Sequence, residues 1–171
     1  MKNVMHTRKF RVFAFFLSVS SVCLSEGAIT STGDVTPAFS GPGIPAWSPL
    51  SDLTIGNTGL GSISVDGLST IANSTASIVY LGFTRTGRGT VSLNTLTPIA
   101  IPSWDIDSTL FAGVAGDSQI DITQGNLTIR ELLGGLYGTS TSTINVTGAG
   151  SSLIAVEGSP RGPSGFVVAL S

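Results

Sequence analysis

The sequence predicts an all-β fold in which short parallel strands stack as a β-solenoid. Apolar and polar residues alternate in segments of three to five residues, glycine-rich corners separate the segments, and the pattern returns every 24–29 residues. Alternation with a period of two places every second side chain on one face of a strand. The segments are rich in Ile, Val and Thr, which favour pleated strands. Strands this short suit the coils of a solenoid, which stack about 4.8 Å apart.

Four degenerate repeats are visible from residue 53 onward. In each repeat, a first strand and a corner precede a second strand, and the second strands begin at residues 63, 91, 120 and 144. A third strand often follows, at residues 69–71, 127–129 and 152–154. Four repeats exceed the three or so that a stack needs to bury a continuous core.

A β-sandwich is the alternative fold, because short strands separated by frequent turns are also typical of that architecture. Residues 94–105 interrupt the repeat, since Pro98 and Pro102 fall where a strand is expected. Disorder is disfavoured by a hydrophobic content of 41 % and a mean hydropathy of +0.40.

Residues 1–27 have the organisation of a secretory signal peptide. A basic head precedes an uncharged apolar run at residues 12–24, and small residues follow at Ser25 and Gly27. The apolar run would span about 20 Å as a helix, which is short of the roughly 30 Å hydrocarbon core. We therefore expect export to the cell surface or the medium. An uncleaved anchor and a lipid-modified Cys23 are the alternatives.

Residues 28–52 are expected to be a Pro/Gly-rich lead-in, either a linker or an N-terminal cap, and residues 53–171 to be the solenoid. Proline occurs too often in the lead-in for a helix or a central strand. Phe39 and Trp47 give it apolar groups that could dock onto the first coil, and repeat arrays need such caps.

The composition beyond the leader excludes several kinds of site. Residues 28–171 contain four arginines and nine acidic residues, and they contain no Lys, His or Cys. Disulfides, zinc sites and His-dependent nucleophile systems therefore lack their residues. A net charge of −5 with scattered arginines disfavours nucleic acid, and a Walker-type phosphate loop lacks its lysine.

Two phrases resemble a known kind of protein. They are Leu-Thr-Ile-Gly-Asn-Thr-Gly-Leu-Gly-Ser-Ile-Ser-Val-Asp-Gly at 53–67 and Ser-Thr-Ile-Asn-Val-Thr-Gly-Ala-Gly-Ser-Ser-Leu at 142–153. They look like repeats of bacterial autotransporter-type passengers and of surface proteins that carry a Pro-Glu-Pro sorting signal. The resemblance covers about residues 29–158 and implies an extended, often adhesive, surface structure without catalytic residues. Because no Pro-Glu-Pro signal follows, the chain would be a short secreted relative or a piece of a longer passenger.

The best candidate acids are Asp105 and Asp107, which alternation places on one face of a strand. Such a pair could bind calcium or act as acid and base on a glycan. The alternative is a solvated loop that contains two acids without a function, which would give the same sequence pattern. Asp117 and Asp121 form a weaker pair of the same kind. A sugar-stacking platform could come from the aromatic residues Trp47, Tyr80, Trp104 and Tyr137.

The sequence favours a secreted or cell-surface structural or adhesive protein that is not an enzyme. We expect no catalytic, cofactor-binding or metal-binding residue, and as partners we expect glycans or surface proteins, not nucleic acid. The chain would contact a membrane only through the signal segment. The alternative is a carbohydrate-active enzyme or glycan-binding module, which requires acids, an arginine and an aromatic side chain to gather in one cleft.

Overall fold

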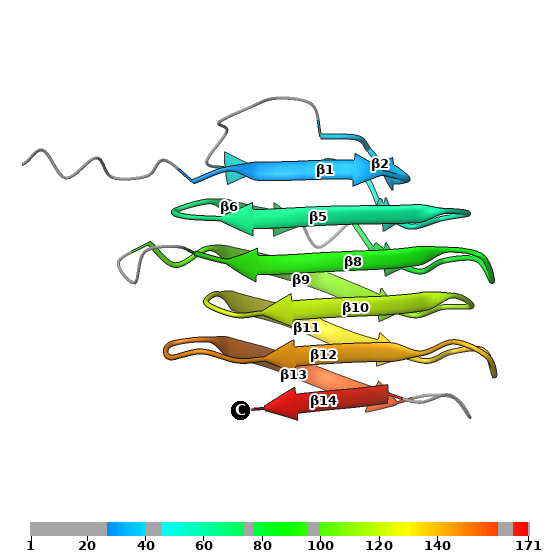
Figure 1. Cartoon of the computed structure of the whole chain (residues 1–171). Coiled ribbons are helices and arrows are strands. Elements are labelled where there is room, and N and C mark those ends of the chain that lie inside the picture. The colour runs from blue at the N-terminus through cyan, green and yellow to red at the C-terminus, as the bar shows by residue number, and fades with distance from the viewer. Residues whose placement is uncertain (1–26, 40–45, 74–76, 96–99, 161–165, 171) are drawn as a thin grey trace, which may run out of the picture.

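The chain folds into a β-solenoid of about four turns (Figure 1). The computed structural model describes residues 27–39, 46–73, 77–95, 100–160 and 166–170, and of side chains only those up to residue 155. In these parts all regular secondary structure is β-strand, with no helix that could cross a membrane. The solenoid prediction is confirmed, and strands of successive coils pair in parallel rather than as an antiparallel sandwich would have them. The predicted signal peptide lies outside the described residues.

One sheet, called sheet A, takes one strand from each coil. Its order is β1 (Ile29–Gly33), β5 (Leu60–Asp66), β8 (Arg88–Asn94), β10 (Asp117–Ile122), β12 (Ser142–Val146) and β14 (Phe166–Leu170). From β5 to β14 the pairing is parallel and without a register shift. The strands β5, β8, β10 and β12 contain the four second strands that the repeats predict.

The second sheet, sheet B, contains the remaining strands. They are β2 (Val35–Thr36), β3 (Ala46–Trp47), β4 (Leu53–Ile55), β6 (Thr70–Asn73), β7 (Val79–Leu81), β9 (Ser103–Ala112), β11 (Asn126–Gly134) and β13 (Ser152–Pro160). The first half of β9 pairs with β6 and its second half with β7. The strand β11 thus combines the predicted third strand at residues 127–129 with the first strand of the next repeat, whereas the first half of β9 is a strand that the repeats did not predict.

The core consists of ladders in which one apolar side chain per coil stacks on the next. In sheet A, the register aligns Ile63, Val91, Ile120 and Ile144, each at most 1 % exposed. In sheet B, it aligns the buried residues Leu53, Val79, Leu110 and Leu132. Burial of apolar area contributes about 25 cal/mol per Å², so these continuous ladders dominate the stability of the stack.

Glycine closes the corner where sheet B passes into sheet A. Gly56, Gly82, Gly113 and Gly135 follow equivalent strands, and their φ angles lie between 60° and 72°. Residues with a side chain rarely adopt this left-handed region. A Cβ atom at Gly82 would also lie 2.2 Å from the carbonyl oxygen of Asp117, at the start of β10 in the following coil. The corner therefore requires glycine for both conformation and space.

The N-terminal strands run against the direction of the coils. Strand β1 pairs antiparallel with β5, and β2 pairs antiparallel with β4. The rings of Phe39 and Trp47, 5.2 Å apart, pack against the core. Residues 29–39 thus lie over the first coil, as Figure 1 shows at the blue end of the stack.

The interruption expected at residues 94–105 is only partly present. Strand β9 begins directly after Pro102 and runs for ten residues. The carbonyl oxygen of Pro102 accepts a hydrogen bond from the Asn126 amide, and the Ser103 amide donates to the Ser69 carbonyl. The proline therefore sits at the start of the strand, where its missing N–H group breaks no pairing. Pro98 lies outside the described residues.

Candidate functional site

The outer face of sheet A is a regular array of hydroxyl and amide side chains. Because inward residues alternate with outward ones, neighbouring strands present Ser62, Thr90, Gln119 and Thr143 in one row. A second row contains Ser64, Ser92, Asp121 and Asn145. Strands lie about 4.8 Å apart and residues two apart about 6.6 Å along a strand, so hydrogen-bonding groups repeat at nearly fixed intervals.

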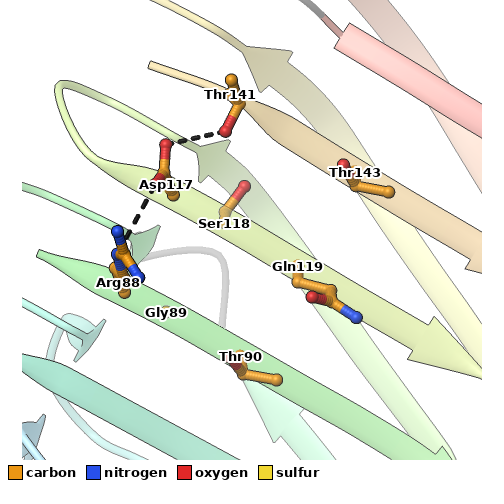
Figure 2. A pocket seen from close by; sticks show the side chains of 8 residues that line it. All are labelled: Arg88, Gly89, Thr90, Asp117, Ser118, Gln119, Thr141 and Thr143. Atoms are coloured by element: carbon orange, nitrogen blue, oxygen red, sulfur yellow. Dashed lines mark hydrogen bonds and ion pairs between the residues drawn. The ribbon is translucent and has the colours of Figure 1, made fainter. Parts of the chain in front are cut away.

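A shallow hollow of about 270 Å³ lies at one end of this array. Figure 2 shows side chains from β8, β10 and β12 around it, with Thr90 and Gln119 on adjacent strands. The lining is mostly polar and includes Arg88, Asp117 and Thr141. It can offer hydrogen bonds to a ligand, but it has no deep wall that would exclude water.

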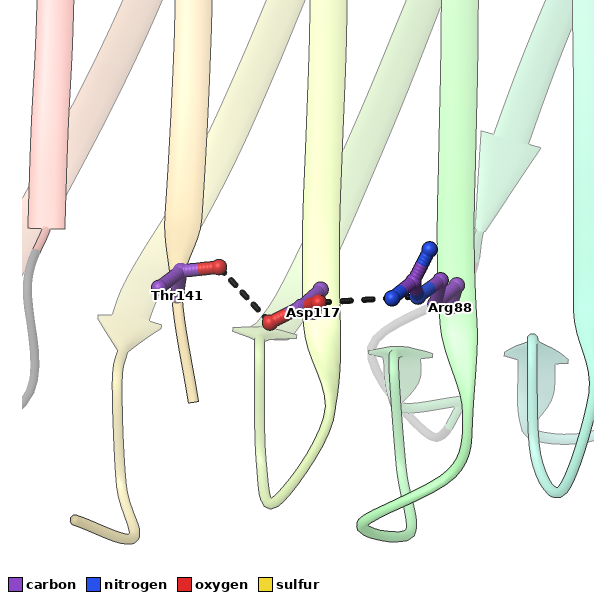
Figure 3. A network of polar contacts seen from close by, with 3 residues as sticks. All are labelled: Arg88, Asp117 and Thr141. Carbon is purple, nitrogen blue, oxygen red and sulfur yellow. Dashed lines mark hydrogen bonds and ion pairs between the residues drawn. The ribbon is translucent and has the colours of Figure 1, made fainter. Parts of the chain in front are cut away.

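The charged groups of this hollow already bond to one another. Thr141 Oγ1 donates to Asp117 Oδ1 at 2.7 Å, and Arg88 Nε lies 3.6 Å from Asp117 Oδ2 (Figure 3). Arg88 is 67 % and Asp117 45 % exposed, so water screens the ion pair and its contribution is small. These contacts tie three successive coils together at the edge of sheet A.

Asp121 makes a similar link in the second row. Its two carboxylate oxygens accept hydrogen bonds from Gln119 Nε2 at 2.6 Å and from Asn145 Nδ2 at 2.7 Å. Asp117 and Asp121, paired in the sequence analysis as a weaker candidate, thus each have partners within the sheet. The part of the chain that the structure describes has no group of three or more His, Cys, Asp or Glu residues that could hold a metal ion.

Sheet B brings the two best candidate acids next to an arginine. Asp105 and Asp107 point outward from β9, while Trp104 and Ile106 between and beside them are buried. They line an open hollow of about 420 Å³ together with Ile106, Thr128 and Arg130. This cavity is called the β9–β11 hollow below. The sequence placed the acids on one face but could not place Arg130, which comes from the next coil.

No aromatic side chain lines the β9–β11 hollow, and the four predicted platform residues do not gather elsewhere. Trp104 is fully buried, and its Nε1 donates to Asn73 Oδ1 at 2.8 Å. Trp47 packs with Phe39, and Tyr137 is 63 % exposed in a corner. The platform formed by Trp47, Tyr80, Trp104 and Tyr137 is therefore absent.

Another aromatic cluster forms on the outer face of sheet B. Tyr80 and Phe111 occupy paired positions of β7 and β9, and their rings stack with centroids 5.3 Å apart. Phe83 meets the Tyr80 ring edge-on at 5.0 Å. Burial raises the pKa of the Tyr80 phenol, and the negative charge of Asp52 raises it further. The sequence signal that could have revealed this pair is the alignment of Val79-Tyr80-Leu81 with Leu110-Phe111-Ala112.

Asp34 holds the turn that precedes β5. Its Oδ2 accepts hydrogen bonds from the amides of Thr58 at 2.6 Å and Gly59 at 3.0 Å. These backbone hydrogen bonds lower the pKa of the carboxyl group because they stabilise its charged form. The role is structural, since the bonds fix the turn at the N-terminal end of the stack.

Comparisons with protein-family models, curated proteins and solved structures found no match for this chain.

Proposed function

We propose that the protein is an exported structural and adhesive repeat protein that acts without catalysis. The observation that carries this proposal is the outer face of sheet A, where hydroxyl and amide side chains repeat from coil to coil. Such a face offers many equivalent weak contacts to a glycan or to another surface protein. The leader-like residues 1–27 and the resemblance of the repeats to passenger proteins support a place at the cell surface or in the medium.

The proposed mechanism is geometric. The apolar ladders hold the strands in register, so the outer groups are ordered before any partner arrives. A binding surface that is already ordered loses little conformational entropy on association. Several weak contacts held at fixed spacing then act together, because each later contact forms at high effective concentration.

The test uses the full chain, expressed with its own first 27 residues and then displayed on beads. We expect the beads to adhere to glycan- or protein-coated surfaces, and the double variant Thr90→Val/Thr143→Val to adhere several-fold less. Valine keeps the shape of threonine and removes the hydroxyl group. Thr54→Val on sheet B is the matched control and should adhere like the unmodified protein. Adhesion that is equal in all three proteins would refute the role of sheet A.

A second candidate function is favoured by the β9–β11 hollow, because it gathers Asp105, Asp107 and Arg130 at one place. Two carboxylates beside a cation suit a glycan-binding module, and a carbohydrate-active enzyme would use the acids as general acid and base. The two are separated by measuring new reducing ends during prolonged incubation with polysaccharides. Sustained release that disappears in Asp105→Asn would replace the non-catalytic proposal with the enzyme.

A further inference from the structure

Among the described side chains, the acids of the β9–β11 hollow differ from the other acids in having no hydrogen-bond partner. Six acidic side chains each accept at least one hydrogen bond, namely Asp34, Asp52, Asp66, Asp117, Asp121 and Glu131. Asp105 and Asp107 accept none from the described residues, and Arg130 forms no ion pair with them within 4 Å. Three charged groups around one hollow are therefore left to bind water or a ligand.

A break in the strand register creates this arrangement. Between the paired positions Ile106–Ile129 and Thr109–Glu131, β9 has Asp107 and Ser108, whereas β11 has only Arg130. Such a bulge bends the strand and redirects side chains, and bulges recur beside binding sites. The Ser108 hydroxyl is buried and donates to the carbonyl oxygen of Ser77, which anchors the bulge from inside. Asp107 remains on the outer face.

The chemistry of the lining restricts the ligand. Carboxylates accept hydrogen bonds from hydroxyl groups, and a guanidinium group donates to hydroxyl or ring oxygen atoms. Two acids and one arginine leave a net negative charge, and Glu131 lies beside Arg130 on β11. An acidic polymer would be repelled, whereas the guanidinium group disfavours a bare divalent cation between the acids.

The outer face of β9 continues beyond the hollow in the direction of the strand. Thr109 is half-buried and donates from Oγ1 to Glu131 Oε2 at 2.7 Å, and Phe111 follows two residues later with its ring stacked on Tyr80. At about 3.3 Å per residue, Asp105 and Phe111 are separated by at most about 20 Å along β9, which bends at the bulge between them. This strip is long enough to contact more than one ring of a chain-like ligand.

We propose that the β9–β11 hollow binds one pyranose ring of a neutral polysaccharide, with Asp105 and Asp107 accepting hydrogen bonds from its hydroxyl groups and Arg130 donating to its oxygen atoms. The inference rests on the proposed adhesive function and gives it a glycan class and a second face. It involves binding only, and no bond of the sugar is broken.

The experiment titrates the full chain, labelled with ¹⁵N, with neutral hexasaccharides of glucose, mannose and galactose. Hexagalacturonic acid and Ca²⁺ are titrated separately. We expect at least one neutral sugar to shift the backbone amide signals of residues 105–107 and 128–130, with a Kd of about 0.1–10 mM, as is typical of one shallow subsite. Arg130→Gln and Asp105→Asn/Asp107→Asn should each weaken this binding at least fivefold.

Arg85→Gln is the matched control, because Arg85 is also an exposed arginine but lies outside this hollow. It should bind the sugar like the unmodified protein, and all variants should keep the thermal transition of the unmodified protein. Tighter binding of hexagalacturonic acid, shifts caused only by Ca²⁺, or unchanged sugar affinity in Arg130→Gln would each overturn the proposal. Sugar binding that persists in Thr90→Val/Thr143→Val while adhesion is lost separates this site from the sheet A face.

Discussion

Sheet A and sheet B are built from the same coils, yet their outer faces differ. In sheet A, one strand per coil pairs without a register shift, and its outward acids Asp117 and Asp121 bond to neighbouring strands. In sheet B, the register breaks at the bulge between Ile129 and Glu131, and Asp105 and Asp107 beside it have no partner among the described residues. The regular register of sheet A thus gives its two carboxylates Asp117 and Asp121 partners on neighbouring coils, whereas the break in sheet B leaves Asp105 and Asp107 free for a ligand.

The difference arises at one bend of sheet B. In three successive coils, the same two ladders are joined by segments of different length. Five residues lie between Asn73 and Val79, three between Ile106 and Leu110, and two between Ile129 and Leu132. The number of residues between the two buried ladders thus falls from coil to coil, while the ladders themselves stay aligned. We therefore expect the two sheets to share one apolar core and to differ only in their outer faces.

The largest expected effect tests whether the core is shared. Leu110 in sheet B and Ile120 in sheet A are both fully buried. Truncating either residue to alanine removes apolar contacts and leaves a cavity, so each change should lower the free energy of unfolding by about 2–5 kcal/mol. Urea unfolding followed by circular dichroism measures both. A cost well below 1 kcal/mol at Leu110 alone would show that sheet B is loosely packed, against the comparison.

The next effect concerns the corner that joins the two sheets. Gly82→Ala forces a side chain into a φ of 61° and places its Cβ against the Asp117 carbonyl. We expect a loss of about 1–2 kcal/mol from the backbone conformation alone, with more from the close contact. Thermal unfolding measures the change.

Gly59→Ala is the control for this substitution. A Cβ atom at Gly59 would meet nothing closer than the Asp34 side chain at 3.9 Å. Apart from the usual entropic effect of replacing glycine, Gly59→Ala should therefore change the free energy of unfolding by no more than a few tenths of a kcal/mol. Equal losses at Gly82 and Gly59 would contradict the requirement for glycine at the corner.

The smallest effect lies at the N-terminal turn and depends on pH. The folded-state pKa of Asp34 is lowered from 3.8 by the amides of Thr58 and Gly59. The charged carboxylate therefore stabilises the fold above pH 3.8, and this contribution is lost as the pH falls through the lowered folded-state pKa. Urea unfolding should show Asp34→Ala to be less stable than the unmodified protein at pH 7, with the difference shrinking at pH 2.

Asp34→Asn keeps an acceptor oxygen but has no titrating group. Its stability relative to Asp34→Ala should therefore not change between pH 7 and pH 2. If the difference in stability between Asp34→Asn and Asp34→Ala did change with pH, the pH dependence would come from a carboxyl group other than Asp34.

Much of the fold could be predicted because periodicity reports directly on burial. The alternation at Ile63, Val91, Ile120 and Ile144 placed the sheet A strands, and the glycines after β4, β7, β9 and β11 marked the corners. Strand β9 was harder to see, because Pro102 suggested a break. Pro102 directly precedes the strand, where no backbone N–H group is needed for pairing. This position follows only from the pairing of β9 with β6 and β11.

The site was less predictable, because it depends on contacts between coils. Alternation correctly put Asp105 and Asp107 on the outer face, but a single strand contains no information about Arg130 in the following coil. Trp104 was misplaced for a related reason. Its neighbours are polar, yet the alternation that exposes Asp105 requires Trp104 to point into the core.

The parallel pairing also sets the order in which the chain can fold. Paired residues of successive coils are separated by about one repeat, as Ile63 and Val91 or Ile120 and Ile144 are, so each coil needs only the previous one as its template. Stacked repeats can therefore add one unit at a time from any formed pair. The antiparallel pairs β1–β5 and β2–β4 offer such a starting point early in the chain. A chain that emerges from its N-terminal end could therefore lengthen its folded part continuously, without waiting for distant segments.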